Sequence, residues 1–106
     1  MTALRELRDK VAEGSFPDYI SNRNLGWDVP ILTPYEAFSG SLDAAKALHE
    51  ALLPGYDWII GRTNDGLTVH ANVGSEAEAF DDCPARAWLL AILDALIAKE
   101  ADDAGQ

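Results

Sequence analysis

The chain has 106 residues and a formal net charge of −10, and 48% of its residues are hydrophobic. This length suffices for a single domain, residues 1–106, and the hydrophobic content is too high for wholesale disorder. So acidic a surface repels nucleic-acid phosphates and anionic membranes, and it favours either solubility or a basic partner. Direct nucleic-acid binding and membrane association are therefore not predicted.

The residue inventory also argues against a secreted or metal-binding protein. Cys83 is the only cysteine, so neither an internal disulfide nor a thiolate metal site is predicted. The first residues are charged and helical in pattern, unlike a signal peptide. No apolar run reaches the roughly 18 to 20 residues that a membrane span needs. We therefore expect a cytosolic protein without a metal or cofactor.

The N-terminal segment has the spacing of an amphipathic helix. Leu4, Leu7 and Val11 recur on one helical face, which predicts a helix over Thr2–Glu13. Gly14 offers a stop.

The next segment, Ser15–Ser41, has weak periodicity and several asparagines, glycines and prolines. It is predicted as a long irregular connection, with a short extended piece at Asp28–Leu32. Connections of this length are uncommon in compact domains and are often functional.

A helix and a strand follow. Ser41 can cap a helix start, Asp43 complements the positive first turn, and Pro54-Gly55 ends the helix. Tyr56–Gly61 is aromatic and β-branched, which predicts a strand. The apolar stripe of the helix comprises Leu42, Ala45, Leu48, Leu52 and Leu53.

A hairpin is predicted after this strand. Asn64-Asp65-Gly66 is typical of a tight turn, and from Leu67 to Val73 apolar and polar residues alternate as in a strand with one buried face. Gly74–Asp82 is predicted as an acidic loop.

The last element is a helix starting near Cys83, with Pro84 in its first turn and a broad apolar face. Residues 100–106 are predicted to fray. The predicted fold is α+β: a small antiparallel sheet packed between or against about three helices, as in an α/β/α sandwich. Because a two-stranded sheet is marginal, Asp28–Leu32 is the candidate third strand.

Several short motifs carry a resemblance to a known family. Leu25-Gly26-Trp27, the segment Ser41-Leu42-Asp43-Ala44-Ala45, and Leu53-Pro54-Gly55 followed by Trp58 resemble small phage proteins of the group called the phage ABA sandwich domain. The Ala-rich start of the last helix, Cys83–Ala87, is similar to the closing helix of that group. The resemblance implies a phage or prophage origin and a sheet between helices, and it implies no settled activity.

No constellation of catalytic residues is recognised, so the chain is predicted not to be an enzyme. His49 and His70 lie on different elements and match no metal spacing, and no Gly-x-Ser-x-Gly elbow positions a serine. His49 is predicted to be a partly exposed helical residue. The acidic group of Glu76, Glu78, Asp81 and Asp82 does not match a calcium loop and is predicted to be solvated.

A binding surface is the better prospect. Arginine forks match phosphates or carboxylates, aromatic rings stack on bases, and polar strand residues supply hydrogen bonds. A nucleotide-sized anion could be held by such a set. The alternative interpretation places Trp58 in the core and pairs Arg62 with an acidic neighbour. The candidate ligand-binding residues are Arg23, Trp27, Tyr35, Arg62, His70 and Asn72.

Three non-enzymatic functions remain open on these grounds. The first is a phage-encoded binding protein of the host cytosol, an anti-defence sponge that sequesters a nucleotide-type immune signal, as a homo-oligomer. The second is an acidic, DNA-mimic-like inhibitor of a basic host protein, whose binding would weaken with salt. The third is a virion or assembly component that oligomerises through the apolar last helix.

Overall fold

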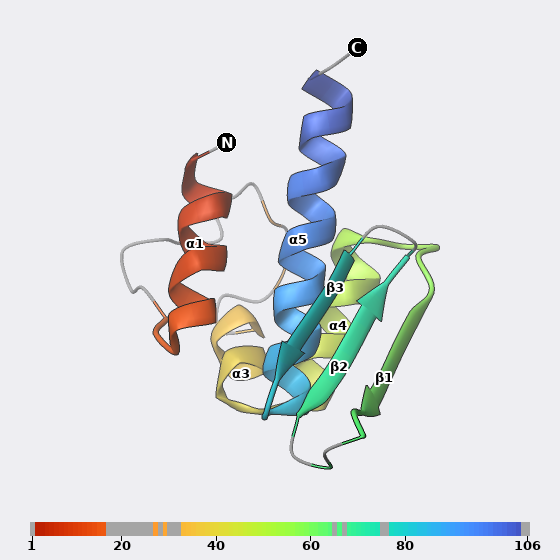
Figure 1. Ribbon diagram of the computed structural model, residues 1–106. Coiled ribbons are helices and arrows are strands. Elements are labelled where there is room, and N and C mark those ends of the chain that lie inside the picture. Colours follow the sequence, from red (N-terminus) through yellow and green to blue (C-terminus); the bar gives the residue numbers. More distant parts are fainter. Residues whose placement is uncertain are drawn as a thin grey trace.

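The computed structural model describes residues 2–16, 27, 29, 33–64, 66, 68–74 and 77–104, with side chains described between residues 4 and 99 of these ranges. Helices α1 (Thr2–Glu13), α3 (Thr33–Ser39) and α4 (Leu42–Leu52) come first. Strands β1 (Trp58–Arg62), β2 (Val69–Val73) and β3 (Ala77–Asp81) follow, and helix α5 (Pro84–Ala104) ends the chain. The strands form one antiparallel sheet in the order β1-β2-β3 (Figure 1).

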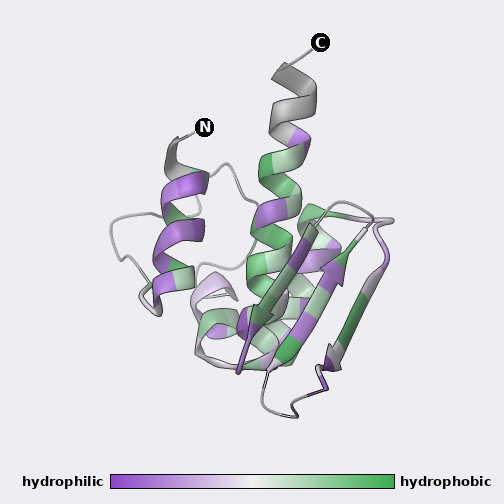
Figure 2. Ribbon diagram, in the orientation of Figure 1, coloured by the Kyte–Doolittle hydropathy of each residue, from purple (hydrophilic) through white to green (hydrophobic). Residues whose placement is uncertain are grey.

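Helix α5 lies at the centre of the molecule and organises the core. It packs against β2 and β3 on one side and against α1, α3 and α4 on its others. Val69, Ala71 and Val73 of β2 and Ala77 and Ala79 of β3 are buried beneath it, and their small volumes let the helix approach the sheet closely. Figure 2 shows the hydrophobic residues concentrated along α5 and the middle of β1.

The predicted α+β class, with a small antiparallel sheet packed against helices, is confirmed. The described helices all lie on one face of this sheet (Figure 1). Of the two predicted arrangements, the described residues therefore form a sheet packed against helices and not a sheet between them. Within the described residues, no helix combines the length and apolarity needed to cross a membrane.

Helix α4 begins and ends as its sequence predicts. The Ser41 Oγ accepts a hydrogen bond from the Ala44 backbone N–H at 3.1 Å, which satisfies a donor that the helix start leaves free. At the other end the Leu53 N–H donates to the His49 carbonyl at 2.8 Å. Gly55 then reverses the chain with a φ of 88°.

Removing this cap gives a simple stability test. Ser41→Ala is expected to lower the free energy of unfolding by about 1 kcal/mol, because the Ala44 N–H loses its acceptor. Urea denaturation followed by circular dichroism measures the change. Ser39→Ala, at an exposed position at the end of α3, serves as the control. Equal losses for the two variants would show that the cap contributes nothing.

The predicted acidic loop over Gly74–Asp82 is wrong, because Ala77–Asp81 forms the third strand. Its alternation of buried alanines with exposed Glu78 and Phe80 is that of a strand with one covered face. The strand is stabilised by pairing with β2 and packing on α5 rather than by the weak strand propensity of alanine and glutamate. Apart from Val29, the predicted strand Asp28–Leu32 lies outside the described residues.

Part of the predicted irregular connection Ser15–Ser41 is also wrong, because it contains helix α3. Pro34 lies in the first turn, where its missing N–H has no cost, and Ala37 is fully buried. The helix ends at Ser39, and the next residue, Gly40, has a φ of 120°, which suits glycine alone. The segment was too short for its periodicity to be recognised.

Helix α5 starts at Pro84 as predicted, but it continues to Ala104, where fraying over residues 100–106 was expected. Its C-terminal turns contain only alanine, lysine, glutamate and aspartate, with no glycine or proline before Gly105. Such a composition supports helix continuation, because none of these residues breaks a helix as glycine or proline does.

Candidate binding surface

The face of the sheet turned away from α5 is the main open surface built by the described strands. Since alternate residues of a strand point to opposite faces, burial of Val69, Ala71 and Val73 turns His70 and Asn72 outward. The strand register adds the neighbours of these two residues on β1 and β3. The outer sheet face consists of Ile59, Gly61, His70, Asn72, Glu78 and Phe80.

Two large apolar side chains on this face remain accessible. Ile59 is 65% exposed and Phe80 is 53% exposed. Phe80 lies opposite His70, whose ring is 4.9 Å away between centroids and tilted by 31°. Asn72 lies between Ile59 and Glu78 in the register. The outer sheet face therefore combines two apolar groups with a polar centre.

An ion-pair geometry fixes the histidine in this centre. His70 Nε2 lies 2.8 Å from Glu78 Oε2. A carboxylate can only accept, so Nε2 carries the hydrogen and donates it. The contact holds the imidazole over Phe80 and leaves the Asn72 amide as a polar group available to a ligand or partner.

The structure brings together only two of the six predicted site residues, His70 and Asn72. Arg62 pairs with Val69 in the register and therefore belongs to the opposite, inner side of the sheet, where its Nη1 donates to the Gly66 carbonyl at 3.4 Å. Trp27 is partly buried against the core. Arg23 lies outside the described residues.

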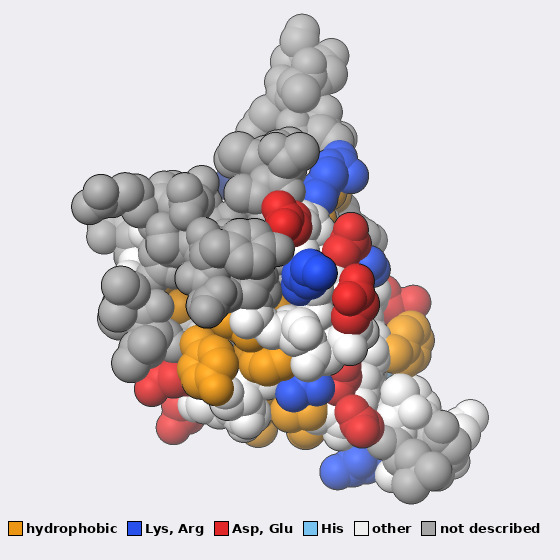
Figure 3. All heavy atoms as spheres, turned by 90° about the vertical axis from the view of Figure 1, so that its left-hand side faces the viewer, with side chains coloured by type: hydrophobic (Ala, Val, Ile, Leu, Met, Phe, Trp, Pro, Cys, Tyr) orange, Lys and Arg blue, Asp and Glu red, His pale blue; other side chains and the backbone are white. Residues whose placement is uncertain are grey.

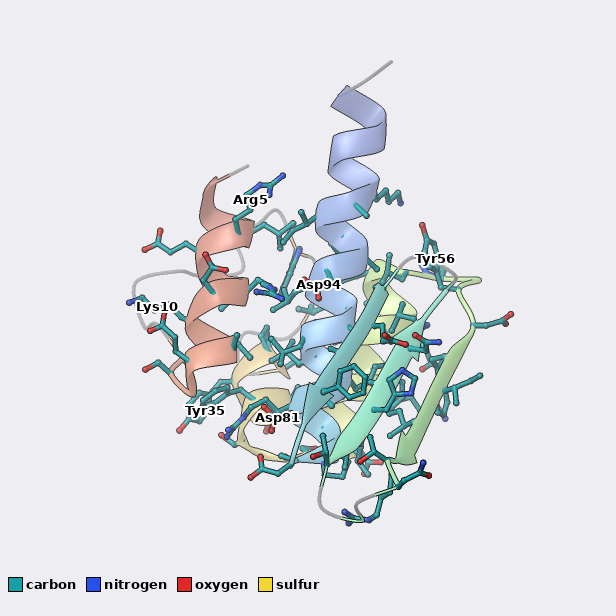
Figure 4. All side chains as sticks on the ribbon, in the orientation of Figure 1. Arg5, Lys10, Tyr35, Tyr56, Asp81 and Asp94 are labelled. Carbon is teal, nitrogen blue, oxygen red and sulfur yellow. The ribbon has the colours of Figure 1, made fainter. Side chains whose placement is uncertain are left out.

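Tyr35 belongs to a separate aromatic cluster in the helical layer. Its ring lies 5.5 Å from that of Phe16, and the Phe16 ring lies 5.4 Å from that of Phe38. The Arg86 guanidinium stacks over Phe38 at 4.3 Å and donates to its carbonyl at 3.2 Å. Figure 4 shows Tyr35 on the α1 and α3 side of the molecule, apart from strand β1. The predicted residues thus occupy at least two separate surfaces.

His49 is not the partly exposed residue that was predicted; it is only 2% exposed. Its Nδ1 accepts from the Trp88 indole N–H at 3.3 Å, and its Nε2 donates to the Tyr56 carbonyl at 2.9 Å. The correction has a physical reason: α4 packs on both α3 and α5, so its buried face is wider than a single stripe. Both imidazole nitrogens are used to hold the core together.

The predicted acidic group is divided by the fold. Glu78 lies on the outer sheet face, Asp81 ends β3, and Asp82 lies in the short connection to α5. Glu76 is outside the described residues. Burial raises the pKa of Asp81, although the Cys83 N–H donates to its carboxylate at 2.9 Å, while a hydrogen bond with Asp81 lowers the pKa of Asp82. Within the described residues, no three His, Cys, Asp or Glu side chains gather as metal ligands would.

A pocket between α1 and α5 is lined by side chains that neutralise each other. Arg8 Nε donates to Asp94 Oδ1 at 2.8 Å, and this hydrogen bond raises the pKa of the guanidinium. The remaining lining residues are Arg5, Asp9 and Ile97. On the side seen in Figure 3, acidic and basic side chains are interleaved. Among the described residues on that side, the carboxylates do not form the continuous array that a DNA mimic needs.

No family model matches the chain, and no curated protein or solved structure shows significant similarity to it. The resemblance to the phage ABA sandwich domain therefore stays a prediction.

Besides Gly61, which has no side chain, sequence reasoning missed three members of the outer sheet face: Ile59, Glu78 and Phe80. The signal that could have found Glu78 and Phe80 was the alternation in Ala77–Asp81, read as a strand beside β2. Ile59 was placed in a strand, but its face depends on the register of the hairpin.

Proposed function

We propose that this chain is a non-enzymatic binding protein that captures a protein partner with its outer sheet face. The observation that carries the proposal is the exposure of Ile59 and Phe80 on a face whose polar centre is ordered by the His70–Glu78 contact. Exposed aromatic and aliphatic side chains act as anchors in protein interfaces, and polar groups beside them supply hydrogen bonds. His49 uses both of its ring nitrogens in contacts within the core, so it is not available to a ligand.

The partner that fits best is a basic protein. The net charge of −10 attracts a positively charged molecule over a long range and steers its approach. The outer sheet face itself carries one carboxylate, that of Glu78, which accepts a hydrogen bond from His70. Charge would thus set the rate of encounter and the apolar groups would set the lifetime of the complex. The concrete form of this proposal is an inhibitor of a basic host protein. The phage origin that the resemblance implies would place it in the host cytosol.

A matched pair of variants tests the proposal. The chain, its Ile59→Ser/Phe80→Ser variant and a Leu42→Ser control are immobilised and exposed to cytosolic extract at low and moderate salt. Leu42 is 47% exposed on α4, so its loss removes a comparable apolar group elsewhere. We expect one basic protein to be retained in stoichiometric amount by wild type and control and at least tenfold less by the double variant. Equal retention by all three, or no stoichiometric partner, would refute the proposal.

A second candidate ligand is a nucleotide, favoured by the Phe80 ring beside His70 and the accessible Asn72 amide. A base could stack on Phe80 and be read by the amide. The Glu78 carboxylate opposes a phosphate on this face, so the protein partner is preferred. Equilibrium dialysis with labelled ATP, GTP and dinucleotides tests the alternative. Micromolar binding that is lost in Phe80→Ala would support sequestration of a nucleotide signal, and its absence would reject it.

A further inference from the structure

Strand β1 is an edge of the sheet with its backbone open to a further strand. The Thr63 N–H donates to the Thr68 carbonyl at 2.9 Å, and the Gly74 N–H donates to the Asp57 carbonyl at 2.7 Å. These contacts flank the β1–β2 register, so the odd-numbered residues turn their backbone groups toward β2. The backbone groups of Trp58, Ile60 and Arg62 consequently point outward from the sheet.

The side chains of β1 suit pairing better than those of the other edge. Its sequence, Trp-Ile-Ile-Gly-Arg, contains no carboxylate, although the chain has 18 acidic residues. Trp58 and Ile59 are 43% and 65% exposed. The opposite edge, β3, carries Glu78 and Asp81, and charges of this kind protect an edge from pairing. Only the β1 edge combines open backbone groups, apolar side chains and a single positive charge.

We propose that a second copy of this chain pairs with β1 through its own β1, in antiparallel orientation about a two-fold axis. The two three-stranded sheets would then form one continuous sheet of six strands. The apolar face of α5 is an unsuitable alternative, since Trp88, Leu89, Ile92 and Leu93 are already buried within the copy that carries them.

The backbone geometry selects one register for this pairing. With Ile60 opposite Ile60 of the second copy, Trp58 lies opposite Arg62 of that copy. All three outward-facing residues of each strand then meet as hydrogen-bonded pairs, giving about six N–H···O bonds. If the register is shifted by two residues toward Tyr56, the pairing needs the Tyr56 N–H. That N–H already donates to the Leu53 carbonyl of its own chain. The centred register therefore satisfies the most backbone groups.

Charge complementarity supports the same register. The Trp58 ring stacks on Trp88 of its own chain at 4.4 Å and remains partly exposed. Arg62 of the second copy would lie directly across from it, where a guanidinium can form a cation–π contact. On the outer side, Ile59 would lie beside Gly61 of the second copy, where no side chain competes for space. Because the proposed dimer is two-fold symmetric, each of these contacts occurs twice.

The overall charge gives the pairing a distinctive salt dependence. Each copy carries −10, so long-range repulsion opposes association. Added salt screens this repulsion, and the dimer is expected to strengthen between low and moderate ionic strength. Sedimentation over a concentration series should show the mass rising from 11.5 kDa toward twice that value, at lower concentrations when salt is added.

Cysteine pairs test the register directly, in a Cys83→Ser background. Residues 59 and 61 of the two copies form a non-hydrogen-bonded pair with Cα atoms about 4.5 Å apart, within the range of a disulfide. Ile59→Cys and Gly61→Cys proteins are oxidised separately and as an equal mixture. We expect covalent dimers chiefly in the mixture. A monomer at all concentrations, or dimers that crosslink equally without mixing, would overturn the proposal.

A charge reversal provides the second measurement. Arg62→Glu places a carboxylate opposite Trp58 of the second copy and is expected to weaken the dimer at least tenfold. Arg5→Glu on α1 makes the same change in net charge and should leave the dimer weakened far less. Equal effects of the two reversals would refute the Trp58–Arg62 contact. The outer sheet face stays open in this dimer, so Arg62→Glu separates loss of the dimer from loss of the proposed partner.

Discussion

Replacing His49 with alanine is expected to lower the free energy of unfolding by about 3 kcal/mol. The substitution removes both hydrogen bonds of the imidazole and leaves a cavity beside Trp88. The Trp88 indole N–H and the Tyr56 carbonyl would each lose a partner in a poorly hydrated environment, at about 1 to 3 kcal/mol for a buried group. Such a loss is a large fraction of the stability of a small domain.

Urea denaturation of four proteins measures this effect and its origin. These are His49→Ala, Trp88→Phe, the double variant, and Glu50→Ala as an exposed control on the same helix. The control should change stability by less than about 0.5 kcal/mol. The double variant should lose less than the sum of the single losses, by about 1 kcal/mol, because the histidine and tryptophan share one hydrogen bond. A His49→Ala loss no larger than that of the control would show that the histidine does not hold this part of the core.

The elements with local signals could be predicted from the sequence. These signals act through the conformations of a few neighbouring residues. They are the helix cap at Ser41, the helix stop at Pro54-Gly55 and the turn at Asn64–Gly66. The structure has α4 and the β1–β2 hairpin at those places. Helix α1 could also be predicted, because its apolar residues repeat with a helical period. In each case the information lies within a few residues along the chain.

Other elements are only weakly indicated by their own residues, because they depend on tertiary contacts. Ala77–Asp81 is a strand because β2 supplies hydrogen bonds and α5 covers its alanines, and neither partner is visible in those five residues. The burial of His49 depends likewise on where Trp88 and Tyr56 come to lie.

The members of the candidate site also depend on tertiary contacts that the sequence does not show. Arg62 and His70 are close in sequence to the same hairpin, which suggested a common ligand. Pairing of Arg62 with Val69 instead places the arginine on the face opposite His70. In a strand a shift of one residue changes the face, so proximity in sequence cannot decide which side chains meet.

Gly74→Ala is expected to be the second strongly destabilising change, with a loss of about 2 to 3 kcal/mol. Gly74 has a φ of 63°, in the left-handed region that costs a side chain about 1 to 2 kcal/mol. A Cβ there would lie 2.9 Å from Cδ2 of the Tyr56 ring, so the ring must also move. Because the Tyr56 carbonyl accepts from His49, this displacement reaches the His49–Trp88 contact.

Gly66→Ala separates the two contributions to this loss. Gly66 has a similar φ of 73°, but a Cβ there meets no atom within 4 Å. It should cost only the backbone strain, about 1 to 2 kcal/mol. Introducing Gly74→Ala into a Tyr56→Ala background should reduce its cost to that of Gly66→Ala, because the ring is gone. If the cost of Gly74→Ala is unchanged by Tyr56→Ala, backbone strain alone accounts for it and the close approach of the ring has no energetic consequence.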